Sequence, residues 1–300
     1  MRKPNIVVCV KQVPDSAQIR VHPVTGTIMR QGVPAVLNPY DLFAVEAALQ
    51  IKDRMGARIV ALCMGPPQAE AVLRKALSLG VDDAVLLSDR AFAGSDTLAT
   101  SFALASVIRT LGKEQQVDLV FTGKQTIDGD TGQVGPGIAK RLGMQLLSYV
   151  CRIPVLDMDA GEIVVHRRTE KGVQVLSSRL PCLITVLEGT NEGRFASLPA
   201  MIRAARQPIR VWDRRAAGIE DLGKIGLKGS PTVVGKVFAP SRRAQRAECI
   251  EWDRERPGDA LEALWDKVLS RQPELAAKVS TESREERREI PDERGRWQAG

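Results

Sequence analysis

Residues 117–142, "VDLVFTGKQTIDGDTGQVGPGIAKRL", decide the fold of this chain. The first six residues are a short apolar run, which predicts a buried strand. A helical pattern begins further along the stretch, and glycines at positions 129, 132, 135 and 137 lie where it starts. Glycine is a poor helix former, so these glycines need another reason. The stretch therefore predicts a strand, a glycine-containing loop with a structural or binding role, and a helix.

Apolar strands and helical stretches also alternate before this unit. Strands are predicted at residues 5–10, 58–64, 83–87 and 117–122, and helices at 40–55, 68–79 and 97–111. This alternation is typical of a parallel sheet with both faces covered. For the first helix, Asn38 is the expected N-cap, Pro39 the first helical residue and Gly56 the stop signal. The predicted fold class is α/β, an open, mostly parallel Rossmann-like sheet with helices on both faces.

The pattern changes after residue 142. The segments "LLSYVCRIPVLD", "GEIVVHRRTEKGVQVLSSRL" and "PCLITVLE" predict strands joined by turns, one at residues 157–161 and one at "EKG". The middle segment predicts an antiparallel hairpin appended to the parallel core. A helix is predicted from about Pro199 to near Pro208. We assign residues 1–210 to one α/β domain.

Residues 211–300 are predicted to form a C-terminal extension. It contains an extended linker and an amphipathic helix at about 258–270, with Leu261, Leu264, Trp265 and Val268 on one side. From Pro273 on, mixed charge and few apolar residues predict a mobile tail unless a partner orders it. Because so short a helix is marginal alone, it must dock somewhere. It docks either on another protein over which this subunit reaches or on the chain's own core.

Composition argues against several kinds of function. No apolar run approaches the ~20 residues that span a bilayer, and the first apolar run is too short for a signal peptide. We therefore expect a cytoplasmic protein without direct membrane insertion. Only His22 and His166 are available for a Ser-His or Cys-His unit, so no catalytic side chain is predicted. The cysteines form no CxxC pair, which argues against a metal site or a disulfide framework. They are Cys9, Cys63, Cys151, Cys182 and Cys249.

The net charge of +7 raises the question of nucleic-acid binding. However, the basic residues are scattered, and no aromatic residues are interleaved with them as a stacking surface requires. We interpret the charge as a basic surface suited to acidic partner proteins or to phosphates.

The glycine-containing loop has the chemistry of a phosphate site. A helix N-terminus presents unpaired N–H groups and a partial positive charge. Thr131 is expected to cap the helix, and Gly129, Gly132 and Gly135 would let backbone amides approach an anion. The loop matches neither GxxxxGK[ST] nor GxGxxG. A tight turn between strand and helix therefore remains an alternative.

Two other strand ends are expected at the same edge of the sheet. One ends at residues 9–11 and the other at residues 62–65, while residues 38–41 begin the first helix. In an open parallel sheet, ligands bind beyond the carboxyl ends of the strands where the strand order reverses. These residues fit an adenine nucleotide held by backbone contacts.

Five stretches together resemble the beta subunit of electron transfer flavoproteins. They are "VVCVKQVPD", "NPYDLFAVEAAL", "CMGPPQ", "DLVFTGKQTIDGDTGQVGPGIA" and "NEGRFASLPAMIRAARQPI", in the family's order over about residues 4–210. The resemblance implies an adenine-nucleotide-binding α/β domain that pairs with an FAD-carrying alpha subunit. It implies a heterodimer that carries electrons between a flavin dehydrogenase, of the acyl-CoA type or another, and an acceptor such as a quinone oxidoreductase.

The resemblance also implies which residues bind. Residues 191–199 would be the partner-recognition loop, with Asn191, Glu192, Arg194 and the anchor Leu198. Gly193 replaces the family's usual proline there and would loosen the loop. The candidate cofactor-binding residues are Cys9, Lys11, Asn38, Pro39, Tyr40, Asp41, Met64, Gly65, Thr126, Ile127, Asp128, Gly129, Asp130, Thr131, Gly132, Gln133, Val134, Gly135, Pro136 and Gly137.

The family divides on what the loop holds. One group binds structural AMP with a loop resembling "DDDxNQTGQ". The other performs electron bifurcation with a second FAD and a loop resembling "GDTAQVGP". This chain reads "GDTGQVGP", which differs only at Gly132. A loop of small residues leaves room for a pyrophosphate, so we favour FAD, with AMP as the alternative. With FAD, the resemblance implies NADH or a similar donor.

Two further hypotheses are of different classes. An ATP-using enzyme of similar α/β fold would need a catalytic lysine, for which Lys11 and Lys124 are the candidates. A nucleic-acid binder would lose affinity steeply with salt, and it ranks last.

Overall fold

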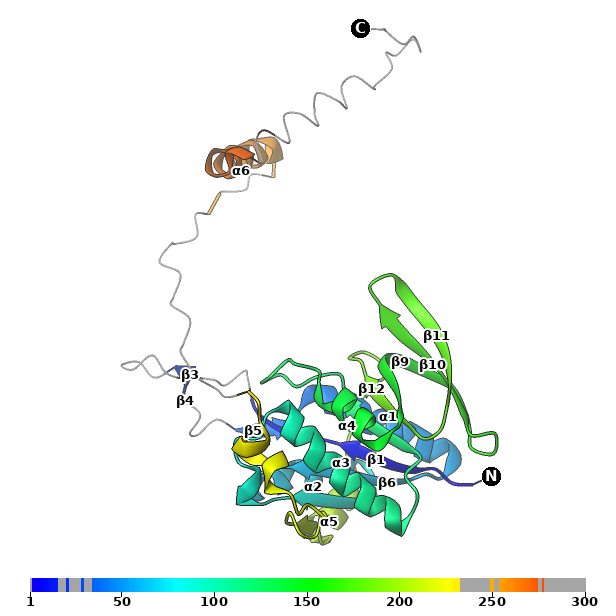
Figure 1. Cartoon of the computed structure of the whole chain (residues 1–300). Coiled ribbons are helices and arrows are strands. Elements are labelled where there is room, and N and C mark those ends of the chain that lie inside the picture. The colour runs from blue at the N-terminus through cyan, green and yellow to red at the C-terminus, as the bar shows by residue number, and fades with distance from the viewer. Residues whose placement is uncertain are drawn as a thin grey trace. The chain divides into compact units, whose positions relative to one another are not determined.

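The computed structural model describes residues 2–15, 20–21, 28–29, 34–232, 249–250, 254–274 and 277. The chain divides into two compact units, Met1–Ala239 and Pro240–Gly300. The first unit contains the nine-stranded sheet and the helices that cover it (Figure 1). Each unit is described by itself.

The sheet of the first unit has the strand order β11-β10-β9-β12-β8-β1-β6-β7-β13. Its central strands pair in parallel, with β1 between β6 and β8. Two short pairs, β2 with β5 and β3 with β4, lie apart from it. The strands are β1 Asn5–Cys9, β2 Gln12–Pro14, β3 Arg20–Val21, β4 Ile28–Met29, β5 Ala35–Leu37, β6 Arg58–Met64, β7 Asp83–Leu87, β8 Leu119–Gly123, β9 Gln145–Asp157, β10 Glu162–Thr169, β11 Gly172–Arg179, β12 Cys182–Val186 and β13 Arg210–Trp212.

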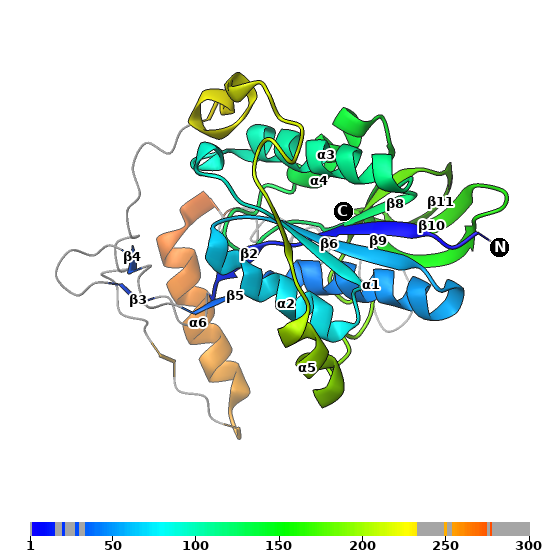
Figure 2. The same ribbon diagram turned by 90° about the horizontal axis from the view of Figure 1, so that it is seen from below.

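Helices cover both faces of this sheet, as predicted. Figure 2 shows α1 and α2 below the sheet and α3 and α4 above it. The helices of the first unit are α1 Pro39–Met55, α2 Glu70–Leu79, α3 Thr97–Glu114, α4 Val134–Leu142 and α5 Leu198–Arg206, with 3-10 turns η2 Pro67–Ala69, η3 Arg90–Phe92, η4 Leu222–Lys224 and η5 Gly226–Gly229. The α/β prediction is therefore confirmed.

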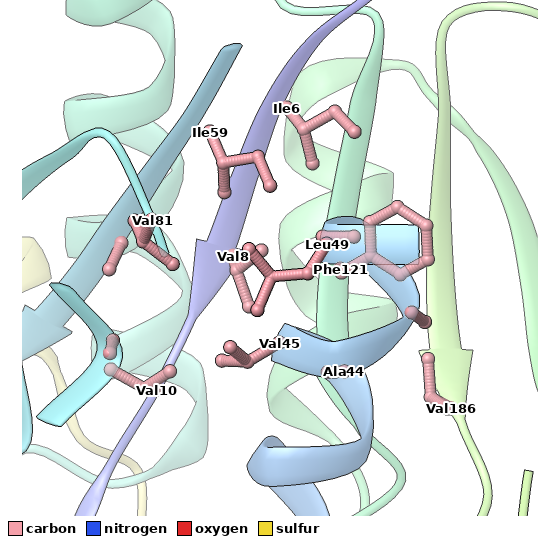
Figure 3. Close-up of a cluster of buried hydrophobic side chains, with 14 of the residues drawn as sticks. Ile6, Val8, Val10, Ala44, Val45, Leu49, Ile59, Val81, Phe121 and Val186 are labelled. Atoms are coloured by element: carbon pink, nitrogen blue, oxygen red, sulfur yellow. The ribbon is translucent and has the colours of Figure 1, made fainter. Parts of the chain in front are cut away.

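Each face of the sheet buries its own hydrophobic cluster. On the α1 side, Ile6 and Phe121 from the strands meet Val45 and Leu49 from α1 (Figure 3). On the α3 side, Leu183 of β12 belongs to a second cluster that includes residues of α3 and α4. Every residue of β1, β8 and β12 is buried. Burial on both faces explains why these strands read as continuous apolar runs rather than alternating ones.

The strand order reverses beside β1. The chain passes from β1 through α1 to β6 and through α2 to β7, and then crosses through α3 to β8 on the other side of β1. The carboxyl ends of β1 and β8 are therefore the switch point of the sheet, where ligands bind in folds of this kind. The glycine-containing loop follows β8 directly.

The predicted hairpin is confirmed as β10 paired antiparallel with β11. It belongs to a larger antiparallel extension, because the second half of β9 pairs with β10 while its first half continues the parallel sheet beside β12. His166 lies within β10, opposite Arg152 and Val175. At the turn before β10, Asp157 Oδ1 accepts hydrogen bonds from the amides of Asp159 and Ala160.

The first unit continues past the predicted domain boundary at residue 210. Strand β13 pairs with β7 at the edge of the sheet, and the following residues pack on α3. Lys224 Nζ lies 5.6 Å from the centre of the Phe102 ring, and Thr232 Oγ1 donates to Asp96. Short polar segments of this kind give little sequence signal, because their packing depends on residues far away in the chain.

The second unit contains the helix α6, Pro257–Arg271, close to the prediction of 258–270. Leu261, Leu264, Trp265 and Val268 are exposed on it. Most of the predicted linker and tail lies outside the described residues, as does His22. No helix among the described residues is long and apolar enough to cross a membrane.

Candidate nucleotide-binding site

The loop between β8 and α4 is attached to the start of α1. Asn38 Nδ2 donates to the carbonyl of Gln125 at 2.9 Å, and Asn38 Oδ1 accepts from the amide of Ile127 at 3.3 Å. Asn38 is the N-cap residue, as predicted, but its side chain makes no capping hydrogen bond. This side chain instead holds the loop, which only the tertiary structure brings within its reach.

Asp41 joins the two strands of the switch point. Its buried carboxylate accepts from the amide of Lys11 after β1 at 2.8 Å and from the amide of Gly123 at the end of β8 at 3.1 Å. Burial raises the pKa of Asp41 to about 7, although the hydrogen bonds from Lys11, Asn38 and Gly123 act in the opposite direction. The first turn of α1 thus fixes both walls of the crevice.

A charged pair closes one side of the loop. Lys11 Nζ lies 2.8 Å from both carboxylate oxygens of Asp128. Burial alone would raise the pKa of Asp128, but the hydrogen bonds from Lys11 and Thr126 outweigh it and hold the pKa below its usual range. Lys11 therefore positions the loop and is not free for the catalytic role considered for it.

The second half of the loop presents a row of free amides. The amides of Gly129 and Asp130 donate to the carbonyl of Thr126, and Gln125 Nε2 donates to Asp130 Oδ1. Beyond this turn, the amides of residues 131–135 have no hydrogen-bond partner in the part of the chain that the structure describes. Successive unpartnered amides at a helix N-terminus form an anion-binding concavity.

Two of the four glycines serve packing. A Cβ on Gly135 would lie 2.8 Å from Thr122 Oγ1, and one on Gly137 would lie 2.7 Å from Ser101 Oγ. These glycines let α4 approach β8 and α3, a packing role beside the anion contact predicted for Gly135. Gly132 has φ 61°, and Asp130, two residues earlier, has φ 52°. These two left-handed residues turn the chain within the loop.

Thr131 does not cap the helix. The helix α4 begins at Val134 with Gln133 at the N-cap position, and Gln133 makes no capping hydrogen bond with its side chain. Instead, Gln133 Oε1 accepts from Thr97 Oγ1 at the start of α3. The prediction failed because proline and glycine inside the helix start obscured its boundary.

A buried polar atom lies beside the free amides. Among the described residues, Thr122 Oγ1 has no hydrogen-bond partner, although Thr122 is only 7% exposed, and it faces Gly135 in the first turn of α4. An orphaned buried hydroxyl next to unpartnered amides is expected where a ligand completes the hydrogen bonding. The residues present therefore fit a phosphate group.

The remaining candidates lie at the neighbouring strand ends. Cys9 ends β1, and burial raises the pKa of its thiol. Met64 ends β6, the strand beside β1. The amide of Gly65 donates to Leu87, and a Cβ there would lie 2.8 Å from Ala69 Cβ, so Gly65 serves the turn into η2.

Tyr40 and Pro39 occupy the first turn of α1. Sequence reasoning left Tyr149 and Glu188 out of this neighbourhood. Lys124 Nζ lies 5.1 Å from the centre of the Tyr40 ring and 2.8 Å from Glu188 Oε1. No sequence signal marks Tyr149, because its proximity depends on the pairing of β9 with β12.

The predicted partner-recognition loop, residues 191–199, is fastened to α1. Asn191 Nδ2 donates to the carbonyl of Phe43, and Arg194 forms ion pairs with Glu46 at 2.9 Å and Asp53 at 2.7 Å. These contacts restrain the backbone beside Gly193. Glu192 is exposed, as are Leu198 at 66% and Phe195 at 98%. Phe195 is an exposed apolar residue that sequence reasoning missed.

A groove of about 480 Å³ lies between α1 and β9, lined by residues that include Gln50, Asp53, Arg152 and Thr190. It contains none of the candidate nucleotide-binding residues. The candidate nucleotide site therefore rests on its hydrogen-bonding groups and not on this groove.

Comparison with known proteins identifies relatives over most of the chain. The family model "Electron transfer flavoprotein domain" matches residues 25–217. Protein FixA of Azotobacter vinelandii is 62% identical over 274 residues, which cover 91% of this chain and 98% of that protein. Subunit CarD of the caffeyl-CoA reductase-Etf complex of Acetobacterium woodii is 47% identical, covering 78% and 87%. The electron transfer flavoprotein subunit beta of Megasphaera elsdenii is 45% identical, covering 80% and 88%.

Proposed function

The chain belongs to the electron transfer flavoprotein family, and from this premise we propose that it is a beta subunit that binds its own FAD and takes part in electron bifurcation. Its electron-transfer role is like that of the beta subunits it resembles. The bound flavin would supply the redox chemistry, while the protein supplies binding and orientation.

The row of unpartnered amides at residues 131–135 carries this proposal. Each oxygen of a phosphate accepts more than one hydrogen bond, so the length of this row of five amides, and not their number, bears on the size of the ligand. A pyrophosphate places its acceptors over a longer span, so it matches this row better than one phosphate does. The small residues Gly129 and Gly132 leave the approach to these amides open.

The partners follow from the family and from the exposed loop. CarD is named as part of a reductase complex that includes an electron transfer flavoprotein. We propose that this chain pairs with an alpha subunit that carries FAD. Phe195 and Leu198 would insert into an apolar pocket of a flavin dehydrogenase of the acyl-CoA or another type. A quinone oxidoreductase is the proposed acceptor, and NADH the proposed donor.

The decisive experiment is nucleotide quantitation on the heterodimer purified after co-expression with its alpha subunit. We expect two FAD per heterodimer and no AMP released on denaturation. One FAD and one AMP would contradict the proposal and support the second candidate, a non-bifurcating beta subunit with structural AMP. The observation that supports this second candidate is that the free amides of residues 131–135 also fit the single phosphate of AMP.

An ATP-using enzyme is a more distant alternative. Lys11 and Lys124, its two candidate lysines, are paired with Asp128 and Glu188. ATP hydrolysis by the purified heterodimer, lost in a Lys124→Met variant, would support it. We expect no such turnover.

A further inference from the structure

Tyr149 has a backbone conformation that its side chain disfavours. Its φ is 57°, and among the described residues only Tyr149 and Asp130 are non-glycine residues with positive φ. An aromatic residue in this region is a strained outlier, and such outliers cluster at functional sites. The ring is also 49% exposed, so burial in the core does not explain why a tyrosine occupies this position.

A bulge in β9 holds Tyr149 in place. The pairing of β9 with β12 shifts register between Ile184 and Val186, and the amide of Tyr149 donates to Thr185 Oγ1 at 3.0 Å. The next residue, Val150, is fully buried in the core. Bulges of this kind re-aim a side chain next to a site, and here the side chain is half exposed.

Strand pairing places the backbone of Tyr149 close to that of Lys124, because Val150 pairs with Val186 and Val186 accepts the amide of Lys124. Lys124 Nζ lies 5.1 Å from the centre of the Tyr40 ring, and its hydrogen bond to Glu188 chiefly holds the pKa of Lys124 above its usual value. Lys124 is the first residue of the loop that carries the free amides, and its own amide donates to Val186 of β12. Lys124 therefore lies at the carboxyl ends of β8 and β12, beside the bulge of β9 that contains Tyr149.

This cluster lies on the opposite side of the switch point from Cys9 and Met64. The ends of β1 and β6 are on one side, and the ends of β8 and β12, with the bulge of β9, are on the other. In doubly wound folds a dinucleotide lies across the switch point, one half on each side. With phosphates on residues 131–135, one half of the ligand would meet Cys9 and Met64, and the other would meet Lys124 and Tyr149.

We propose that Tyr149 and Lys124 form the contact site for the second ring system of a dinucleotide, the flavin of FAD, whose phosphates bind at residues 131–135. This inference rests on the proposed function. The Tyr149 ring offers a face for stacking. The Lys124 ammonium has three donors, and besides the one paired with Glu188 it offers a donor for a carbonyl oxygen or ring nitrogen of the ligand.

The test compares FAD with AMP, because AMP lacks the half that Tyr149 would contact. Heterodimer freed of nucleotide at the site of this chain is titrated calorimetrically with each ligand. Tyr149→Leu is expected to raise the Kd for FAD about 3- to 10-fold, the range for one aromatic contact, and to leave that for AMP within about twofold. Tyr149→Phe keeps the ring and is expected to bind FAD almost as the wild type does.

Two controls separate this role from a structural one. Tyr149→Gly removes the ring and relieves the backbone strain, so its weaker FAD binding is expected without a lower melting temperature. Leu146→Ala removes another exposed side chain from the same strand, and it is expected to leave both affinities unchanged.

Several outcomes would overturn the inference. Wild-type FAD affinity in all Tyr149 variants would do so, as would equal weakening of FAD and AMP. A loss of alpha-subunit binding with unchanged FAD affinity would assign Tyr149 to the subunit interface instead. Wild-type heterodimer that binds AMP but no second FAD would sink the proposed function, and this inference with it.

Discussion

At the scale of single residues, Asp41 is the buried group on which the crevice depends. Its carboxylate accepts the amides of Lys11 and Gly123, one from each strand of the switch point. Removing an acceptor from a buried amide costs about 1–3 kcal/mol. Burial disfavours the ionised form of this carboxyl group and raises its pKa, whereas the hydrogen bonds that it accepts favour the ionised form.

We predict that Asp41 lowers the stability of the protein as pH rises, the opposite of the usual effect of a carboxylate. Its pKa in the folded protein is about 7, above the ~3.9 of an unfolded aspartate. The folded state therefore retains this proton while the unfolded chain loses it, and stability falls as pH rises from about 4 to about 7. Denaturant unfolding of wild type and Asp41→Asn should show the wild type losing stability relative to the variant across this window. The exposed Asp159→Asn is the control, and parallel curves for wild type and Asp41→Asn would refute the prediction.

Substitutions at Gly132 and Gly143 distinguish the effect of backbone strain on stability from an effect on ligand binding. Their φ values are 61° and 66°, and a Cβ on Gly143 would meet no atom within 4 Å. We predict that Gly132→Ala and Gly143→Ala each lower the free energy of unfolding by about 1–2 kcal/mol, the cost of a left-handed alanine.

Only Gly132→Ala should also weaken nucleotide binding, because residue 132 lies within the row of free amides. Its Cβ would lie 3.2 Å from the carbonyl of Lys124, so the loop must shift to accept it. Chemical denaturation measures the first effect, and calorimetric titration with AMP measures the second. Equal AMP affinity in the two variants would show that the loop does not hold the phosphate.

At the scale of elements, α1 connects the two predicted sites. Its first turn holds the nucleotide loop through Asn38 and Asp41, and its middle holds the partner-recognition loop through Glu46. Both attachments are hydrogen bonds and ion pairs between segments far apart in the sequence. A rigid helix fixed at both places keeps the two loops at a constant separation.

We predict that Glu46→Gln loosens the partner-recognition loop without unfolding the protein. The Glu46 side chain is 7% exposed and that of Arg194 is 31% exposed, so the loss should be about 1–3 kcal/mol. Proteolysis beside Gly193 should become faster in this variant. Asp53→Asn, which removes a partner that is 58% exposed, should cost at most about 1 kcal/mol. Unchanged proteolysis in Glu46→Gln would contradict the attachment.

At the scale of the whole molecule, the described residues of the proposed nucleotide site all lie in the first unit. The hydrogen bonds described for it join residues between Lys11 and Glu188. The second unit contributes α6, whose apolar residues are exposed. A lone helix of fifteen residues is marginal in water, so we expect α6 to dock either on a partner or on the chain's own core, and we propose the partner.

We predict that a chain ending at Ala239 keeps the melting temperature and the AMP affinity of the full chain but binds the alpha subunit more weakly. Trp265→Ala in the full chain tests the same point with one substitution on α6. Calorimetry and co-purification measure these properties. Full alpha-subunit affinity in both variants would exclude α6 as the docking element, and a lower melting temperature on truncation would place it on the chain's own core instead.

The sequence by itself determined the elements and their class. Strands buried on both faces read as apolar runs, so β1, β6, β7 and β8 were recognisable, and Asn38, Pro39 and Gly56 marked the ends of α1. It also determined that the loop after β8 meets the other strand ends, because parallel strands share one carboxyl edge.

Only the tertiary structure decided which polar groups have hydrogen-bond partners and which glycines are in close contact with other elements. It assigned Gly135 and Gly137 to packing, the Asn38 side chain to the loop, and Tyr149 to the edge of the site. It also showed that the first unit extends beyond residue 210, because β13 pairs with β7 and later residues pack on α3. The physical reason is the same in each case. Local propensity depends on near neighbours along the chain, whereas hydrogen-bond partners and close contacts come from residues that the fold brings together.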